Sequence, residues 1–447
     1  MKWLKRILIG LAALLAALVA VAVAIPFFIS VDDYVPRIEA AVSDKLKEPV
    51  RIGKIHLSGL PVPHVVIDSI TVGKTEDLKV GKVTVTPRLS SLFSATKVLR
   101  SIEIDSLVMT QKALDKIPVW SKQEARPDQP AQVRIESIRL DDALVKLDKT
   151  SFGPFDARVR LGDQGQPEEA SFTTRDGKLK AVVTPDGPNY AFSASAKSWQ
   201  APAGPPIVFD SLEIKGTATL KDAAFSEISA RLYGGAASGK ATVAWQKGLQ
   251  LKGNFDIRQV ELRSLVPIVS PGTNMSGRLN AKPVFSASAA EGSQLLAALH
   301  LETPFDVHNG VLHGVDLQKA AMKMLGGGSG GGETHFNQLS GHVVRDRRAH
   351  KFSGLKISSG VLAADGDVNI SARQELSGRV NAKVNALGTS ATVALNVSGT
   401  VHSPSLLPTG GTVAGAALGT AILPGIGTGV GAKAGQRLEG LFGKKAK

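Results

Sequence analysis

Apolar and polar residues alternate with a period of two along most of this chain, and that pattern limits the fold more than any other feature. Between residues 249 and 257, Leu, Gly, Phe and Ile occupy every second position, with Gln, Lys, Asn and Asp between them. Segments of the same kind are 83–85, 102–104, 212–220, 380–384 and 393–397. Successive side chains of a strand point to opposite faces, so each such strand has one apolar and one polar face. This is typical of an antiparallel sheet wetted on one face.

The sequence therefore predicts a mainly β protein built on an antiparallel sheet, with few helices. Apolar residues at helical spacing predict short helices over residues 35–47 and 316–325, the second with Asp316 as its N-cap. The residues expected on the apolar inner face of the sheet are Val83, Val85, Ile102, Ile104, Leu212, Ile214, Leu251, Phe255, Ile257, Val393, Leu395 and Val397.

An uncharged apolar run, residues 7–31, follows the basic residues Lys2, Lys5 and Arg6 and precedes an acidic pair. A helix rises about 1.5 Å per residue, so this run is long enough for a hydrocarbon core of roughly 30 Å. It predicts a single transmembrane helix that contains Ile7, Leu14, Leu18, Val23 and Ile29. The positive-inside rule places the N-terminus in the cytoplasm and the rest of the chain outside it.

A cleaved signal peptide is the alternative interpretation of this segment. The Ala-Val-Ala tract at residues 22–24 fits a cleavage site between small residues, although the apolar run continues beyond it. Both interpretations place the body of the protein in the same compartment.

Changes in composition divide the chain into five parts. Residues 121–131 are polar and contain proline, which predicts a linker, and the tract 270–272 (Ser-Pro-Gly) opens a later module. The predicted parts are a cytoplasmic stub and anchor (1–31), an N-terminal module (32–120), a middle β region (121–269), a C-terminal region (270–408) and a tail (409–447). In the tail, residues 412–431 are uncharged, apolar and glycine-rich, and basic residues follow. Membrane insertion and a mobile tail both fit that composition.

Several kinds of chemistry lack the residues that they need. The chain has no cysteine, which excludes disulfides, thiolate nucleophiles and iron–sulfur ligation. The formal net charge of +14 favours anionic surfaces such as bacterial membranes, and Lys and Arg are not gathered with aromatics as in a nucleic-acid groove. The G-x-S-x-G match at residues 327–331 lies in a glycine run after a helix, unlike a nucleophile elbow.

Six of the nine histidines lie between residues 300 and 350, which makes a metal site conceivable. No H-E-x-x-H motif or close carboxylate spacing supports such a site, and polar loop residues are the alternative. No pair of carboxylates can be nominated for acid–base catalysis. We therefore expect a protein that is not an enzyme, with no catalytic residue, cofactor or metal.

Short motifs near both ends of the chain follow one another in a recognisable order. The N-terminal motifs are LKEPVRIGKI (46–55), LPVP (60–63), IDSITVG (67–73) and LRSIEI (99–104). The C-terminal motifs are HNGVLHGVDL (308–317), THF (334–336), LSG (339–341), the segment 360–370, VSGT (397–400) and Pro404. In this order, after an apolar helix and a short amphipathic one, they resemble the AsmA family of diderm bacterial envelope proteins.

That resemblance implies a fold and a function. The family is similar to bridge-like lipid transfer proteins, whose β-rich rods curve into a groove that carries acyl chains between membranes. The expected fold is an elongated, twisted antiparallel sheet curved into an open, U-shaped groove, with one transmembrane helix. The N-terminal module would be AsmA/chorein-like, and the body would lie in the periplasm, anchored in the inner membrane.

The function that the resemblance implies is the movement of phospholipids toward the outer membrane, in support of outer-membrane biogenesis and integrity. The expected partners are phospholipid acyl chains, the inner membrane and, through the tail, the outer membrane or an envelope protein. Two alternatives stay open. The apolar face could pack on a second sheet in an ordinary sandwich. The protein could also be a scaffold or assembly factor for outer-membrane proteins.

Overall fold

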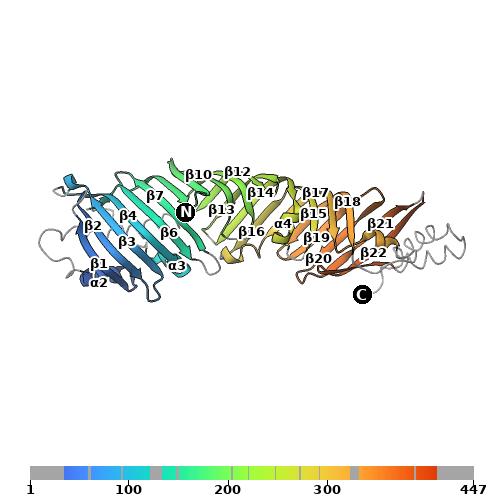
Figure 1. Ribbon diagram of the computed structural model, residues 1–447, viewed down its shortest axis with the longest axis horizontal. Coiled ribbons are helices and arrows are strands. Elements are labelled where there is room, and N and C mark those ends of the chain that lie inside the picture. Colours follow the sequence, from blue (N-terminus) through green and yellow to red (C-terminus); the bar gives the residue numbers. More distant parts are fainter. Residues whose placement is uncertain are drawn as a thin grey trace. The chain divides into compact units, whose positions relative to one another are not determined.

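The protein is mainly β, with 23 strands in one mixed sheet and four α-helices among the residues that the structure describes (Figure 1). The structure is a computed structural model. It describes residues 35–58, 62–91, 94–120, 133–146, 151–202, 205–219, 221–246, 248–270, 273–290, 292–322, 332–386 and 389–409. The chain forms two compact units, residues 1–203 with 211–226, and residues 204–210 with 227–447.

Several predicted segments lie wholly or mostly outside the described residues. They are the transmembrane run 7–31 with Ile7, Leu14, Leu18, Val23 and Ile29, the linker 121–131, the glycine run 326–332 and all but the first residue of the tail. Among the helices of the described ranges, none combines the length and the apolar character needed to cross a membrane.

The first unit, called unit 1, contains α2 (Val35–Leu46), α3 (Gln111–Trp120) and ten whole strands. The strands are β1 (Val50–Ser58), β2 (His64–Val72), β3 (Leu78–Pro87), β4 (Lys97–Thr110), β5 (Val133–Ile135), β6 (Ser137–Lys146), β7 (Ser151–Leu161), β8 (Pro167–Thr174), β9 (Leu179–Asp186) and β10 (Asn189–Gln200). Strands β11 (Val208–Ala218) and β12 (Asp222–Leu232) each contain one of the boundaries between the two units.

The second unit, called unit 2, contains α4 (Leu262–Val269), α5 (Leu317–Met322) and eleven whole strands. The strands are β13 (Gly235–Ala244), β14 (Leu249–Glu261), β15 (Met275–Ala281), β16 (Val284–Ala289), β17 (His300–His313), β18 (Glu333–Asp346), β19 (Ala349–Ser358), β20 (Leu362–Ile370), β21 (Leu376–Ala386), β22 (Thr389–Thr400) and β23 (Ser403–Pro408). From β17 to β23 each strand pairs antiparallel with the next.

The predicted helix over residues 35–47 is confirmed as α2, which covers the start of the sheet. Ile38, Val42 and Leu46 are spaced by four residues, so they share one face of the helix, and all three are buried in the core of unit 1. The same helix protects the outer edge of β1. Glu39 accepts a hydrogen bond from the Ile52 amide at 2.6 Å, and the Ser43 hydroxyl accepts one from the Val50 amide at 2.9 Å.

The prediction of a purely antiparallel sheet is wrong at β4. This strand pairs in parallel with β5 and β6, where Lys97 lies opposite Val133 and Ile102 opposite Ile138. Parallel neighbours need a crossover of about a dozen residues or more, and residues 111–132, which include α3, supply it. Alternation reports which face a side chain occupies and not the direction of the strand, so it could not predict this crossover.

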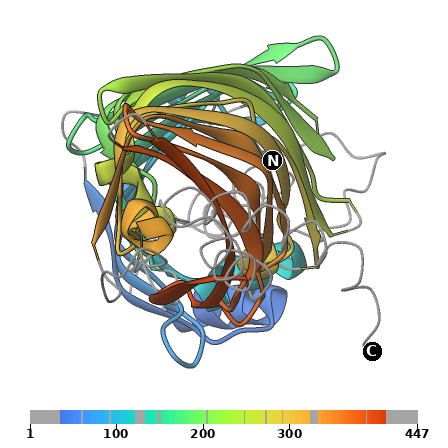
Figure 2. The same cartoon turned by 90° about the vertical axis from the view of Figure 1, so that its right-hand side faces the viewer.

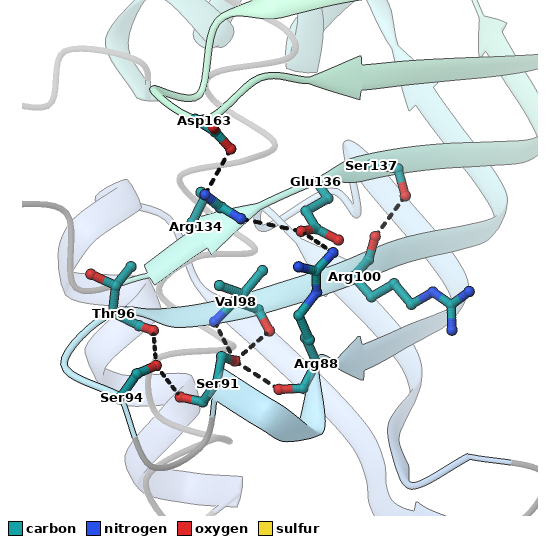
Figure 3. Close-up of polar contacts among 10 residues, drawn as sticks. All are labelled: Arg88, Ser91, Ser94, Thr96, Val98, Arg100, Arg134, Glu136, Ser137 and Asp163. Atoms are coloured by element: carbon teal, nitrogen blue, oxygen red, sulfur yellow. Dashed lines mark hydrogen bonds and ion pairs between the residues drawn. The ribbon is translucent and has the colours of Figure 1, made fainter.

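Charged side chains join the strands beside this parallel pairing (Figure 3). The Glu136 carboxylate, between β5 and β6, lies 2.6 Å from the Arg88 guanidinium and 3.3 Å from that of Arg134. Arg134 also donates to Asp163 at 2.7 Å. The network therefore connects the end of β3, strand β5 and the β7–β8 turn.

A second group of charges ties α3 to the turn before β3. Lys116 Nζ lies 2.8 Å from Glu48 Oε1 and 3.0 Å from Asp77 Oδ2, and the Thr75 hydroxyl donates to Asp77 at 2.6 Å. The Asp77 side chain is only 5 % exposed. The Thr75 hydrogen bond, together with Lys116, lowers the pKa of Asp77 below its ordinary value despite its burial.

Asp77→Asn is expected to lower the stability of unit 1 by about 1–3 kcal/mol at pH 7. A carboxylate whose pKa is depressed by folding contributes this stability above its unfolded pKa of about 4, and the contribution is lost as the pH falls through the lower folded value. Urea midpoints at pH 7 and pH 3 measure the difference between wild type and variant, with the exposed Asp44→Asn as control. If the stability difference between wild type and Asp77→Asn were the same at pH 7 and pH 3, the ionised Asp77 carboxylate would not be its source.

In unit 2 the helices α4 and α5 cover part of the apolar face of the sheet. Leu317 and Ala321 of α5 are buried against a core that includes Val393 and Leu395 of β22, and Leu262 of α4 joins the same core. Figure 2 shows α5, in orange, on the inner side of the curve made by the strands of unit 2. Asp316 is the predicted N-cap, and its carboxylate accepts a hydrogen bond from the Lys319 amide at 2.7 Å.

Candidate functional site: the half-exposed apolar face

On the later strands of unit 1, none of the described helices covers the apolar face of the sheet. In β8, β9 and β10, cross-strand rows place Ala170, Val183 and Phe192 side by side, and Phe172 beside Ala181. All five side chains are only half-buried, whereas α2 and α3 pack on the buried core near β1 to β6. The described residues thus leave an apolar sheet face accessible in unit 1.

Three phenylalanines stand at the start of this face. The Phe155 and Phe172 ring centroids are 4.8 Å apart, and Phe152 stacks on Phe172 at 5.6 Å. Phe152 and Phe155 reach the same face because β7 carries a bulge between them, where two residues of β7, Gly153 and Pro154, lie opposite one of β6, Leu144. The rings form an apolar platform that remains half-buried.

Unit 2 repeats this arrangement on β13, β14 and β16. On β14, Leu249, Leu251, Phe255 and Ile257 are half-buried, and the intervening Gln250, Lys252 and Asn254 are exposed, as the alternation predicts. The facing positions of β13 and β16 are Ala237, Gly239, Ala241, Val243, Phe285, Ala287 and Ala289. Most of these neighbours are small, so they leave room above the sheet.

Glycines lie directly opposite phenylalanines at four places in unit 2. The pairs are Gly239 with Phe255, Gly253 with Phe285, Gly310 with Phe336, and Gly341 with Phe305. At Gly239, Gly253 and Gly310 the ring of the partner occupies the space where a Cβ would stand. At Gly341 the Leu355 side chain, at 2.8 Å from that position, is nearer than the Phe305 ring, at 3.2 Å. The rings therefore lie flat over the neighbouring strand and do not stand upright from the sheet. Phe255 and Phe285 stack nearly parallel, with centroids 5.7 Å apart.

Gly253→Ala is expected to destabilise unit 2 by about 1–3 kcal/mol, because the new methyl group would overpack the sheet. Its Cβ would lie 2.6 Å from the Phe285 ring and 2.7 Å from the Lys240 carbonyl oxygen. This cost exceeds the roughly 0.4–1 kcal/mol gained by restricting the unfolded chain. Urea unfolding measures it, and Asn254→Ala on the polar face is the control. A variant as stable as wild type would show that the ring does not need the glycine.

The residues predicted to line the inner face fall into two groups in the structure. Half-buried positions on the accessible face are Ile214, Leu251, Phe255 and Ile257. Buried positions are Val83, Val85, Ile102 and Ile104 in the core of unit 1, Val393 and Leu395 in that of unit 2, and Leu212 and Val397 elsewhere. The positions in the two cores pack against other buried side chains, so they have no room for a ligand.

Four histidines of unit 2, His308, His313, His335 and His342, lie beside carboxylates rather than around a common centre. His313 is 2.8 Å from Glu333, His342 is 3.2 Å from Glu302, and His308 contacts Asp306. The residues that the structure describes contain no group of three or more His, Asp or Glu side chains able to hold a metal ion.

Together, these features define a mainly β protein with an accessible apolar sheet face in each of two units. No protein-family model, no curated protein and no solved structure matches the chain. The chemistry of this face is therefore the basis for a functional assignment. Side chains of this kind bind apolar groups by removing them from water.

Proposed function

We propose that this chain is an AsmA-like protein of a bacterial envelope, anchored in the inner membrane by its N-terminal run. Its periplasmic body handles phospholipids by holding their acyl chains on the apolar face of a curved, elongated sheet. It thereby moves lipids toward the outer membrane, with no catalytic residue and no cofactor. The half-burial of Leu251, Phe255 and Ile257 carries the proposal, because these large side chains would otherwise face water.

Comparison with the cores supports acyl chains as the occupant. Leu251 and Ile104 stand on strands of the same alternating type, yet Ile104 is 1 % exposed and Leu251 is half-buried. An acyl chain would complete the burial of such a face, and each CH₂ group removed from water contributes about 0.8 kcal/mol. A sandwich would need a second sheet, whereas the described strands belong to one.

A scaffold that recruits proteins along its sheet edge has weaker support. Glu39 and Ser43 of α2 already bond to amides of β1. The short strand β23 contains Pro404 and Pro408, which have no amide hydrogen to offer a new strand. Both edges are thus poorly suited to pairing with another chain.

The proposal is tested by the lipids that the full chain retains. The protein is extracted in a mild maltoside detergent, and bound phospholipids are counted by native mass spectrometry. Several phospholipids per chain are expected. A lipid-free chain that carries stoichiometric protein partners would instead favour the scaffold function.

A further inference from the structure

An arginine and a histidine interrupt the apolar face of unit 2. Across β16 to β20, one cross-strand row consists of Phe285, Leu301, Arg345, His350 and Ile370. All five are half-buried. The row beside it contains Val343 opposite Phe352, with the buried Thr303 on the other side of Val343, so mainly apolar side chains flank the Arg345–His350 pair away from the β18–β19 turn. A cation on an otherwise apolar face is costly unless it serves a partner or a ligand.

The Arg345 guanidinium has no carboxylate partner among the described residues. Its Nε donates to the Arg347 carbonyl oxygen at 2.8 Å, and Nη2 lies 3.4 Å from the Leu296 carbonyl oxygen. Asp346 is the adjacent residue on the strand, so it points to the opposite face. The charge of Arg345 is therefore uncompensated in the part of unit 2 that the structure describes.

His350 offers a second unsatisfied polar group. Its Nδ1 atom is buried and has no hydrogen-bond partner among the described residues. The ring stacks on Phe352 with centroids 6.4 Å apart at an interplanar angle of 18°, and His350 lies directly opposite Arg345. Burial and the neighbouring charge of Arg345 lower the pKa of His350. The neutral ring can still donate from Nδ1 in one of its tautomers.

The β18–β19 turn adds positive charge at this end of the row. Arg347 and Arg348 occupy the turn and are exposed, and Leu296 in the adjoining segment is 51 % exposed although it is apolar. The Arg347 amide bonds to the Leu299 carbonyl oxygen at 3.0 Å, so turn and segment are joined. Basic side chains next to an exposed apolar one suit an anionic, amphipathic ligand.

We propose that Arg345 and His350 form a phosphate site that holds the headgroup of an anionic phospholipid at the apolar face of unit 2. The guanidinium would donate to the phosphate oxygens, as arginine does in charge-assisted pairs, and His350 would donate a further hydrogen bond. The acyl chains would lie over Leu301, Val343 and Phe352. This site rests on the proposed function, since it presumes that acyl chains occupy the face.

The test compares three soluble probes on the full chain in a maltoside detergent. They are dihexanoyl phosphatidylglycerol, dihexanoylglycerol without a phosphate, and inorganic phosphate, and calorimetry measures the affinity of each. Arg345→Gln removes the charge. His350→Phe removes the ring nitrogens and keeps a flat ring. Because this variant leaves Arg345 in place, a loss of lipid binding in it cannot come from a structural role of Arg345. Lys351→Gln, exposed on the opposite face, is the matched control.

Each site variant is expected to weaken phosphatidylglycerol binding by about tenfold to a hundredfold and to leave dihexanoylglycerol and the control unchanged. Unchanged affinity for phosphatidylglycerol in both site variants overturns the headgroup site, and the proposed function then stands. Failure of both lipids to bind the wild-type chain overturns both. Inorganic phosphate that binds as tightly as phosphatidylglycerol, with the same loss in the variants, identifies an adventitious or free-phosphate site and overturns the lipid assignment.

Discussion

Leu251→Asp is expected to remove most of the phospholipid that copurifies with the chain, while the fold is retained. Leu251 lies in the middle of the accessible face, between Val243 of β13 and Ala287 of β16. A carboxylate there stays solvated when the face is empty, because the position is half-buried. It must lose water when an acyl chain covers it, at a cost of at least about 2 kcal/mol. Lipid affinity should then fall at least about tenfold.

Lys252→Asp is the matched control for this variant. It introduces the same side chain one residue further along β14, on the exposed polar face. Native mass spectrometry counts the lipids on both variants, and circular dichroism with limited proteolysis checks their folds. Equal lipid retention by the two folded variants would show that the apolar face does not hold acyl chains.

Ile104→Ala is expected to have the largest effect on stability, about 2–5 kcal/mol in unit 1. Its side chain is 1 % exposed and lies between Val83 of β3 and Leu140 of β6, so truncation leaves a cavity that its neighbours cannot fill. The midpoint of urea unfolding measures the loss. Lys54→Ala at an exposed position of β1 is the control, and it should change stability by less than about 0.5 kcal/mol.

A half-buried position should respond differently to the same truncation. Ile214→Ala removes a side chain that no described layer covers, and it should cost clearly less than Ile104→Ala. A loss at Ile214 as large as that at Ile104 would mean that both side chains belong to packed cores. The accessible face would then be closed, and the basis of the proposed function would disappear.

The alternation in the sequence predicts the strands and their faces well, because a period of two is a local property. Every odd position from Leu249 to Ile257 is half-buried, as expected. Strand direction at β4 was not predictable in this way, since it depends on the crossover over residues 111–132. Helices α3 and α4 were also missed, since both are short and contain a proline, Pro118 and Pro267.

The candidate site was predictable only in part. Ile104 and Ile214 have the same local pattern, and what separates a core position from an accessible one is a covering layer contributed by distant residues. A clue to the phosphate site was nevertheless present in the sequence. Leu339, Gly341 and Val343 set the apolar period of β18, and the next position in that period is Arg345. The tract 345–348 contains three arginines, a local cluster that the net charge of the whole chain does not reveal.

Photocrosslinking in living cells tests most directly whether acyl chains occupy the apolar face. Benzoylphenylalanine replaces Phe255 on that face or, as control, Asn254 on the polar face of the full chain, and adducts are identified by mass spectrometry after irradiation. The benzophenone reacts with nearby C–H bonds, so phospholipid adducts are expected at position 255 and not at position 254. Protein adducts alone at position 255, or lipid adducts that are equally abundant at both positions, would contradict the proposed lipid-handling function.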